Sequence, residues 1–154
     1  MCRVFVLLSM LFLSVTTHAR SDEFDANQFA LNYYNAWIAT QSPQAKKSHI
    51  QKYLSLLKDD VGHQHLPYDP DAKRMPNGKQ NMFEGMLYYL GAHTEYAAEL
   101  TNVVMGYKVV VLKYSTQSRG KHPQTGQLIE QSYDTIEVLE LEDGKVAVIR
   151  KYSE

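Results

Sequence analysis

The C-terminal part of the sequence consists of long extended segments separated only by short turns. Glu142-Asp143-Gly144 and Met105-Gly106 are typical of tight turns, and the polar stretch 119–126 has the glycines and the proline of a hairpin tip. The strands are predicted at 94–104, 107–118, 127–141 and 145–152. Strands that follow one another in this way form an antiparallel meander, and one face of such a sheet has to be covered by other elements.

Two helical patterns begin the part of the chain that precedes these strands. Asp25 is expected to cap the first helix, with Gln28 completing a reciprocal capping pair, and apolar residues at helical spacing extend this helix to about Thr40. Ser42-Pro43 supplies a cap residue and a first-turn proline, so we expect the second helix to begin there and to end at Lys58-Asp59-Asp60.

A short strand, a loop and a third helix complete the order of elements. We expect the strand at 61–66, the proline-containing loop at 67–78 and the helix at 79–90, where Gly91 ends it. The apolar stripe of this helix, which includes Met82 and Met86, is expected to pack into the core. Three helices followed by a meander predict a single α+β domain.

Residues 1–19 have the pattern of a secretory signal peptide. Arg3 gives a positive start, the stretch 4–15 is nearly all apolar, and Thr17-His18-Ala19 offers the small residues that a signal peptidase reads. We expect cleavage after Ala19, a mature domain at 20–154 that is secreted or periplasmic, and no membrane association after cleavage. The alternative, a retained membrane anchor, requires an apolar run longer than this one.

Charge and cysteine content exclude several classes of function. The formal net charge is −1, so no basic field is available to bind a nucleic-acid backbone. Cys2 is the only cysteine and lies in the predicted signal peptide, so the mature domain has no disulfide and no cysteine-based metal site. No phosphate-binding loop or serine nucleophile motif is present, and we expect no cofactor.

Glu137 is the first candidate for a functional residue. Side chains alternate between the faces of a strand, and Glu137 shares its predicted face with Tyr133, Leu139 and other apolar residues. If the hairpin at Asp143-Gly144 is regular, Glu137 faces Arg150. This pair is either a proton-transfer group with a ligand-fixing guanidinium or a structural ion pair that joins two strands.

Two histidines form the second candidate group. His63 and His65 lie two positions apart on the short strand and therefore on one face. Such a pair can ligate a metal with a third ligand from His93, Asp69 or Glu137, but no second ligand pair is recognisable, so we assign no metal site. The histidines are better candidates for acid–base chemistry, and Tyr68 follows closely enough to donate a hydrogen bond to a ligand oxygen.

The order of these parts resembles the SnoaL-like branch of the nuclear transport factor 2-like superfamily, which includes polyketide cyclases and ketosteroid isomerase relatives. The resemblance covers residues 25–152 and is carried by four stretches: 29–37 (FALNYYNAW), 59–67 (DDVGHQHLP), 77–83 (NGKQNMF) and 137–146 (EVLELEDGKV). It implies a cone-shaped, curved antiparallel sheet wrapped by three N-terminal helices, and a homodimer formed through the sheet.

The resemblance also implies positions for site residues. Glu137 matches the acidic position on the strand before the Asp-Gly-Lys turn, and either His63 or His65 matches the family histidine. The closing strand departs from the family, because Val148, Ile149 and Arg150 stand where the family often has glutamate, histidine or tryptophan.

We expect the domain to bind a small-molecule ligand in a pocket, without catalysis. The alternative is a cofactor-free proton-transfer enzyme, of isomerase, cyclase or dehydratase type, that acts on a small hydrophobic, oxygen-bearing substrate through Glu137, His63 or His65, and Tyr68. The predicted ligand-binding residues are Tyr33, Trp37, Tyr89, Tyr133, Arg150 and Tyr152.

Overall fold

The structure is a computed structural model that describes residues 24–154. The predicted signal peptide and its cleavage site after Ala19 lie outside the described residues. Within the described part, the chain forms the helices and strands α1 (Ala26–Gln41), α2 (Lys47–Leu54), β1 (Leu57–Leu66), α3 (Gly78–Tyr88), β2 (His93–Gly106), β3 (Val109–Lys121), β4 (Leu128–Glu142) and β5 (Lys145–Ser153). None of these helices has the length and apolar character needed to cross a membrane.

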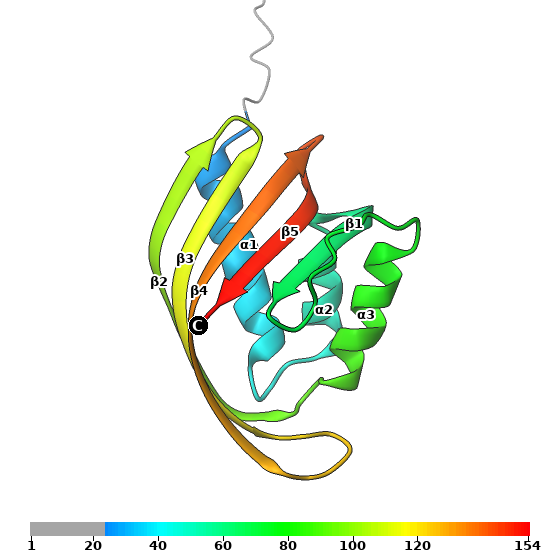
Figure 1. The fold of residues 1–154 in the computed structure, drawn as a ribbon, viewed down its shortest axis with the longest axis vertical. Helices are drawn as coiled ribbons and strands as arrows, with labels where there is room; N and C mark the ends of the chain where they lie inside the picture. The colour runs from blue at the N-terminus through cyan, green and yellow to red at the C-terminus, as the bar shows by residue number, and fades with distance from the viewer. Residues whose placement is uncertain (1–23) are drawn as a thin grey trace, which may run out of the picture.

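The strands form one curved sheet whose order is β1-β5-β4-β3-β2. In Figure 1 the sheet bends around the helices, and the hairpin between β3 and β4 curls beneath them. Strands β2 to β5 form the expected antiparallel meander, whereas β1 pairs in parallel with β5. The expected α+β cone is thus confirmed, with one parallel edge strand added to it.

The core lies between the concave face of the sheet and the helices. It contains apolar side chains of α1, α2 and the inward faces of β3, β4 and β5, which bury large areas away from water. Its fully buried members include Tyr33, Ile50, Tyr53, Leu57, Leu112, Tyr114, Leu139 and Ile149.

The first helix begins as the sequence predicts, whereas the second does not. The carboxylate of Asp25 accepts the backbone N–H of Gln28 at 3.0 Å, but the Gln28 side chain donates to Asn32 and does not return to the cap. Ser42 ends α1, and its hydroxyl accepts the N–H of Gln44 in a turn, so the prediction of a helix start at Ser42-Pro43 is wrong.

The second helix ends at Leu54 because the residues from Leu57 onward belong to β1. Leu57 is fully buried and pairs with Val146 of β5, so Lys58-Asp59-Asp60 are strand residues and do not end a helix. Tertiary pairing has overridden the local helical pattern at this point.

The register between β4 and β5 decides which side chains share the concave face. Leu141 pairs with Val146, but Glu140 pairs with Val148, so Ala147 is an extra residue in β5. Beyond this bulge Glu137 pairs with Lys151. A bulge of one residue moves every later side chain of the strand to the other face.

Candidate functional site

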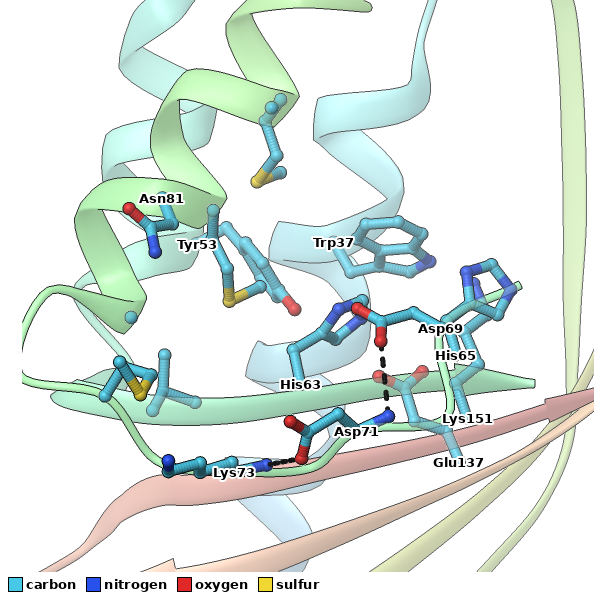
Figure 2. A pocket seen from close by; sticks show the side chains of 16 residues that line it. Trp37, Tyr53, His63, His65, Asp69, Asp71, Lys73, Asn81, Glu137 and Lys151 are labelled. Atoms are coloured by element: carbon cyan, nitrogen blue, oxygen red, sulfur yellow. Dashed lines mark hydrogen bonds between the residues drawn. The ribbon is translucent and has the colours of Figure 1, made fainter. Parts of the chain in front are cut away.

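A cavity of about 520 Å³ lies between the three helices, β1, the loop 67–77 and the concave face of the sheet. Figure 2 shows its side chains converging from these elements, with Trp37 from α1 and Tyr53 from α2. The lining residues are Trp37, Tyr53, Val61, His63, His65, Asp69, Asp71, Lys73, Met75, Gly78, Asn81, Met82, Gly85, Met86, Glu137 and Lys151. Its volume is that of a site for a small molecule.

Three ionisable side chains form a row across the sheet at one end of this cavity. Glu137 of β4 pairs with Lys151 of β5, and Lys151 pairs with His65 of β1. His63 lies one pleat along β1, opposite Ile149. Because directly paired residues of neighbouring strands project from the same face, sheet geometry alone brings a carboxylate, an amine and two imidazoles into one hollow.

Glu137 is held by two tyrosine hydroxyls. The carboxylate is 3% exposed, and Tyr33 and Tyr114 donate to its two oxygens at 2.6 Å each. The hydroxyl of Tyr53, which lines the cavity, lies 3.0 Å from that of Tyr33. Burial raises the pKa of Tyr33 well above its usual range, and the charge of Glu137 raises it further, so the hydroxyl remains a donor.

Lys151 faces aromatic rings as well as the carboxylate. Its Nζ lies 4.6 Å from the ring centroid of Trp37 and 5.8 Å from that of Tyr114, as in cation–π contacts. Burial lowers the pKa of Lys151, and the nearby Glu137 opposes this effect. The amine therefore loses its proton more readily than a lysine in water.

Both histidines of the cavity favour the uncharged imidazole. Burial lowers the pKa of His63, with Glu137 opposing it, and burial lowers the pKa of His65 to about 4, helped by Lys151. The two rings lie 6.2 Å apart between centroids. At neutral pH each ring therefore has one nitrogen that accepts a hydrogen bond or a proton.

The loop 67–77 closes one side of the cavity and is fixed at both ends. Asp69 forms a backbone bridge with His65, in which each N–H donates to the other's carbonyl at 2.7 Å. Arg74 donates to Asp60 and Glu142 at 2.8 Å each. Asp69 and Asp71 each accept a backbone N–H two residues ahead, so these carboxylates also shape the loop (Figure 2).

Helix α3 supplies the apolar wall opposite the histidines. The cavity-lining positions of this helix recur at intervals of three and four residues, as expected for one helical face, and are Gly78, Asn81, Met82, Gly85 and Met86. Gly85 lines the cavity and is exposed, and a Cβ atom there would meet no atom within 4 Å, so a larger side chain has room at this position. Met82 and Met86, which we expected to serve only the core, pack against it and also line the cavity.

The predicted pairing of Glu137 with Arg150 is wrong. Arg150 pairs with Val138 on the opposite face of the sheet, where its Nε donates to Glu140 at 2.8 Å. The bulge at Ala147 is the physical reason, because it places Lys151, and not Arg150, beside Glu137. Arg150 is therefore outside the cavity and cannot hold a ligand there.

Several of the predicted tyrosines also lie elsewhere. Tyr152 pairs with Ile136 on the outer face of the sheet. Tyr68 is exposed and its hydroxyl lies 2.8 Å from that of Tyr133. Tyr89 is exposed and lines a separate hollow of about 530 Å³, with Tyr68 and His65. The cavity brings together Glu137, His63, His65 and Trp37 of the predicted site, while Tyr33 supports Glu137 from within the core.

Within residues 24–154 no group of three or more histidine and carboxylate side chains is placed to hold a metal ion. His93, one of the conceivable third ligands, directs its Nδ1 to the carbonyl of Gln41 at 2.9 Å. The lowered pKa values of His63 and His65 leave both rings able to accept a proton or a hydrogen bond.

Sequence reasoning missed Lys151, Tyr53 and Tyr114 as parts of the site. Tyr53 belongs to an apolar helical stripe and Tyr114 to a strand, and nothing local distinguishes them from core residues. The sequence does offer an indication for Lys151. It follows Arg150 directly, and a one-residue bulge before them places Lys151 opposite Glu137 where a regular hairpin would place Arg150.

Comparison with known proteins agrees with this architecture at low sequence identity. No protein-family model matches the chain, and a search of curated proteins found no match. A candidate SnoaL-like polyketide cyclase from Shewanella putrefaciens CN-32 superposes with a TM-score of 0.63 at 14% identity, covering 82% of this chain and 88% of that one.

Two further solved structures have the same arrangement. A nuclear transport factor 2-like protein of unknown function from an Exiguobacterium species gives a TM-score of 0.60 at 11% identity over 82% of this chain and 98% of its own. A ketosteroid isomerase-like protein from Erwinia carotovora gives 0.56 at 17% identity over 82% and 92%. The chain therefore has the fold of the SnoaL-like and nuclear transport factor 2-like proteins.

Proposed function

We propose that the cavity binds a small, mainly hydrophobic molecule that carries a carbonyl or hydroxyl oxygen. The observation that carries this proposal is that the cavity combines an apolar wall with polar groups from the sheet and from the loop 67–77. Trp37, Met82 and Met86 supply apolar contact, while Glu137, Lys151 and His65 supply hydrogen-bonding groups. Ligand pockets commonly combine these two kinds of surface.

The charges around the cavity favour an uncharged ligand. The cavity is lined by two basic side chains, Lys73 and Lys151, and by three acidic ones, Asp69, Asp71 and Glu137. Its two imidazoles favour the neutral form. Opposite charges at similar number attract neither an anion nor a cation strongly. The indole Nε1 of Trp37 is buried and has no hydrogen-bond partner among the described residues, so a ligand oxygen there would satisfy it.

Titration followed by the fluorescence of Trp37, the single tryptophan of the chain, tests the binding proposal. We expect 2-decanone and 1-decanol to change the emission saturably and decane to do so more weakly. Gly85→Leu, which adds a bulky side chain at a position that lines the cavity, should weaken binding at least about tenfold, and Glu84→Leu on the neighbouring exposed position of α3 should not. Equal binding by both variants would place the ligand elsewhere.

A second candidate function is cofactor-free proton transfer on such a molecule. It is favoured by the approach of Glu137, neutral His63 and the Tyr53–Tyr33 hydroxyl pair, which together can accept and relay a proton. Glu137 would remove a proton from the carbon beside a ligand carbonyl. The Lys151 amine and a histidine would hydrogen-bond the oxygen as negative charge develops on it.

Exchange of the α-protons of 2-decanone in D2O, followed by NMR, separates binding from proton transfer. Glu137→Gln should lower exchange at least about a hundredfold if Glu137 is the base. Binding without exchange in the unmodified protein supports the non-catalytic function.

Export and dimer formation are further parts of the proposed function. The N-terminal signal pattern supports a secreted or periplasmic domain. Val104, Ile136 and Tyr152 are exposed apolar residues on the outer face of the sheet, and they support a homodimer through that face.

A further inference from the structure

Lys151 differs from Lys58 and Lys79, the other half-buried lysines of the part of the chain that the structure describes, in what surrounds its amine. Lys79 and Lys58 form ion pairs with Asp59 and Asp143 at 2.6 and 2.9 Å. Within residues 24–154, no carboxylate oxygen lies within 4.0 Å of the Lys151 Nζ, and the amine lies over the Trp37 ring at the cavity wall. The amine is thus available to a molecule in the cavity.

The surroundings of this amine are those of a nucleophile. Burial lowers the pKa of Lys151, so a larger fraction carries the free electron pair that attacks carbon. Glu137 is the cross-strand partner of Lys151, and Glu137 and the neutral His63 line the same cavity as the amine. Both groups can therefore exchange protons with an intermediate that forms on the amine. Lysines that form imines combine a desolvated amine with a neighbouring proton-transfer group.

We propose that Lys151 forms a reversible imine with an aldehyde or ketone that binds in the cavity. The inference rests on the proposed function and deepens it, because it names the carbonyl class of ligand and a covalent step. It also gives a role to a half-buried amine at the cavity wall that, among residues 24–154, no carboxylate oxygen approaches within 4.0 Å.

The step conserves atoms and electrons without a further reactant. The nitrogen lone pair of the neutral amine attacks the carbonyl carbon, the carbon–oxygen π pair moves to oxygen, and one proton passes from nitrogen to oxygen to give a carbinolamine. The hydroxyl group then takes a proton and leaves as water while the nitrogen lone pair forms the C=N bond, and the nitrogen gives up its remaining proton, so that the imine and one water are the only products. Glu137 and His63 are the groups placed to carry these protons.

Trapping with sodium cyanoborohydride at pH 7 tests the proposal, with decanal as the probe. Reduction fixes an imine as a secondary amine, which intact mass and peptide mapping detect. We expect one dominant adduct, on Lys151, and an initial rate at least about tenfold lower in Lys151→Met. Lys145→Met, an exposed lysine on the same strand, is the matched control and should keep the adduct.

The variant Lys151→Arg shows whether a lost adduct reflects misfolding, because arginine preserves the positive charge but cannot form an imine. It should bind 2-decanone, as seen by Trp37 fluorescence, yet give no adduct. Adducts spread evenly over exposed lysines, or an unmodified Lys151 in a protein that binds 2-decanone, would overturn the imine and leave the proposed function standing. If neither 2-decanone nor decanal changes the fluorescence of Trp37 in the unmodified protein, the proposed binding function itself fails.

Discussion

The uncharged state of His65 predicts a loss of stability in mild acid. Burial lowers the pKa of His65 from 6.5 to about 4, and Lys151 and His63 act in the same direction while Asp69 opposes them. The unfolded chain therefore takes up a proton at pH values where the folded protein does not. Stability from this source is complete above pH 6.5, falls between 6.5 and about 4, and falls no further below that.

The size of the effect follows from that interval. At about 1.4 kcal/mol per pH unit, the interval from 6.5 to about 4 corresponds to about 3 kcal/mol. His65 is only partly buried, and solvent screening reduces this figure to roughly 1–2 kcal/mol.

Urea unfolding of the unmodified protein and of His65→Gln, at pH 7.5 and at pH 4.5, measures this contribution. The free energy of unfolding should fall by roughly 1–2 kcal/mol more in the unmodified protein than in the variant. Contributions from carboxylates cancel in the comparison, and the two proteins should run parallel between pH 7.5 and 8.5, which serves as the internal control. An equal acid loss in both proteins would refute the environment that we assign to His65.

Three further predictions concern the fold, export and assembly. A Cβ atom at Gly62 would fall on the backbone carbonyl of Ala72, so Gly62→Ala should lower the free energy of unfolding by at least about 2 kcal/mol, whereas Gly85→Ala, which meets nothing, should be neutral or stabilising in the same urea assay. Intact mass of the protein recovered outside the cytoplasm should correspond to a chain that begins after Ala19, and a mass that includes residues 1–19 would contradict the signal prediction. Sedimentation should show a dimer that Ile136→Glu dissociates, and a monomeric unmodified protein would contradict assembly through the sheet.

The fold could be predicted because its signals are local. Asp25 caps α1 because its carboxylate accepts a free backbone N–H of the first turn. Asp143 and Gly144 both adopt positive φ in the hairpin turn that the sequence indicates. Where the sequence failed, a distant segment decided the outcome. β1 begins at Leu57 because it pairs in parallel with β5 from that residue on. The sequence pattern within 57–66 does not indicate which strand it will pair with.

The candidate site was predictable to the extent that alternation within one strand determines it. Glu137 lies on the concave face of β4 because its neighbours Thr135 and Leu139 do, and His63 and His65 lie together on β1 for the same reason. Alternation gives no information about which residues of another strand stand opposite. Contacts such as those from Tyr33 and Tyr114 to Glu137 depend on tertiary packing, which the spacing of residues does not encode.

A single residue, Ala147, sets the chemical character of the cavity. In a regular hairpin around Asp143-Gly144, Glu137 would stand opposite Arg150, and a guanidinium that remains charged at all accessible pH values would occupy the cavity. The bulge puts Lys151 there and turns Arg150 outward to Glu140. Because a lysine amine can lose its proton when buried and a guanidinium cannot, the bulge converts a purely electrostatic site into one that can also transfer protons or attack a carbonyl carbon.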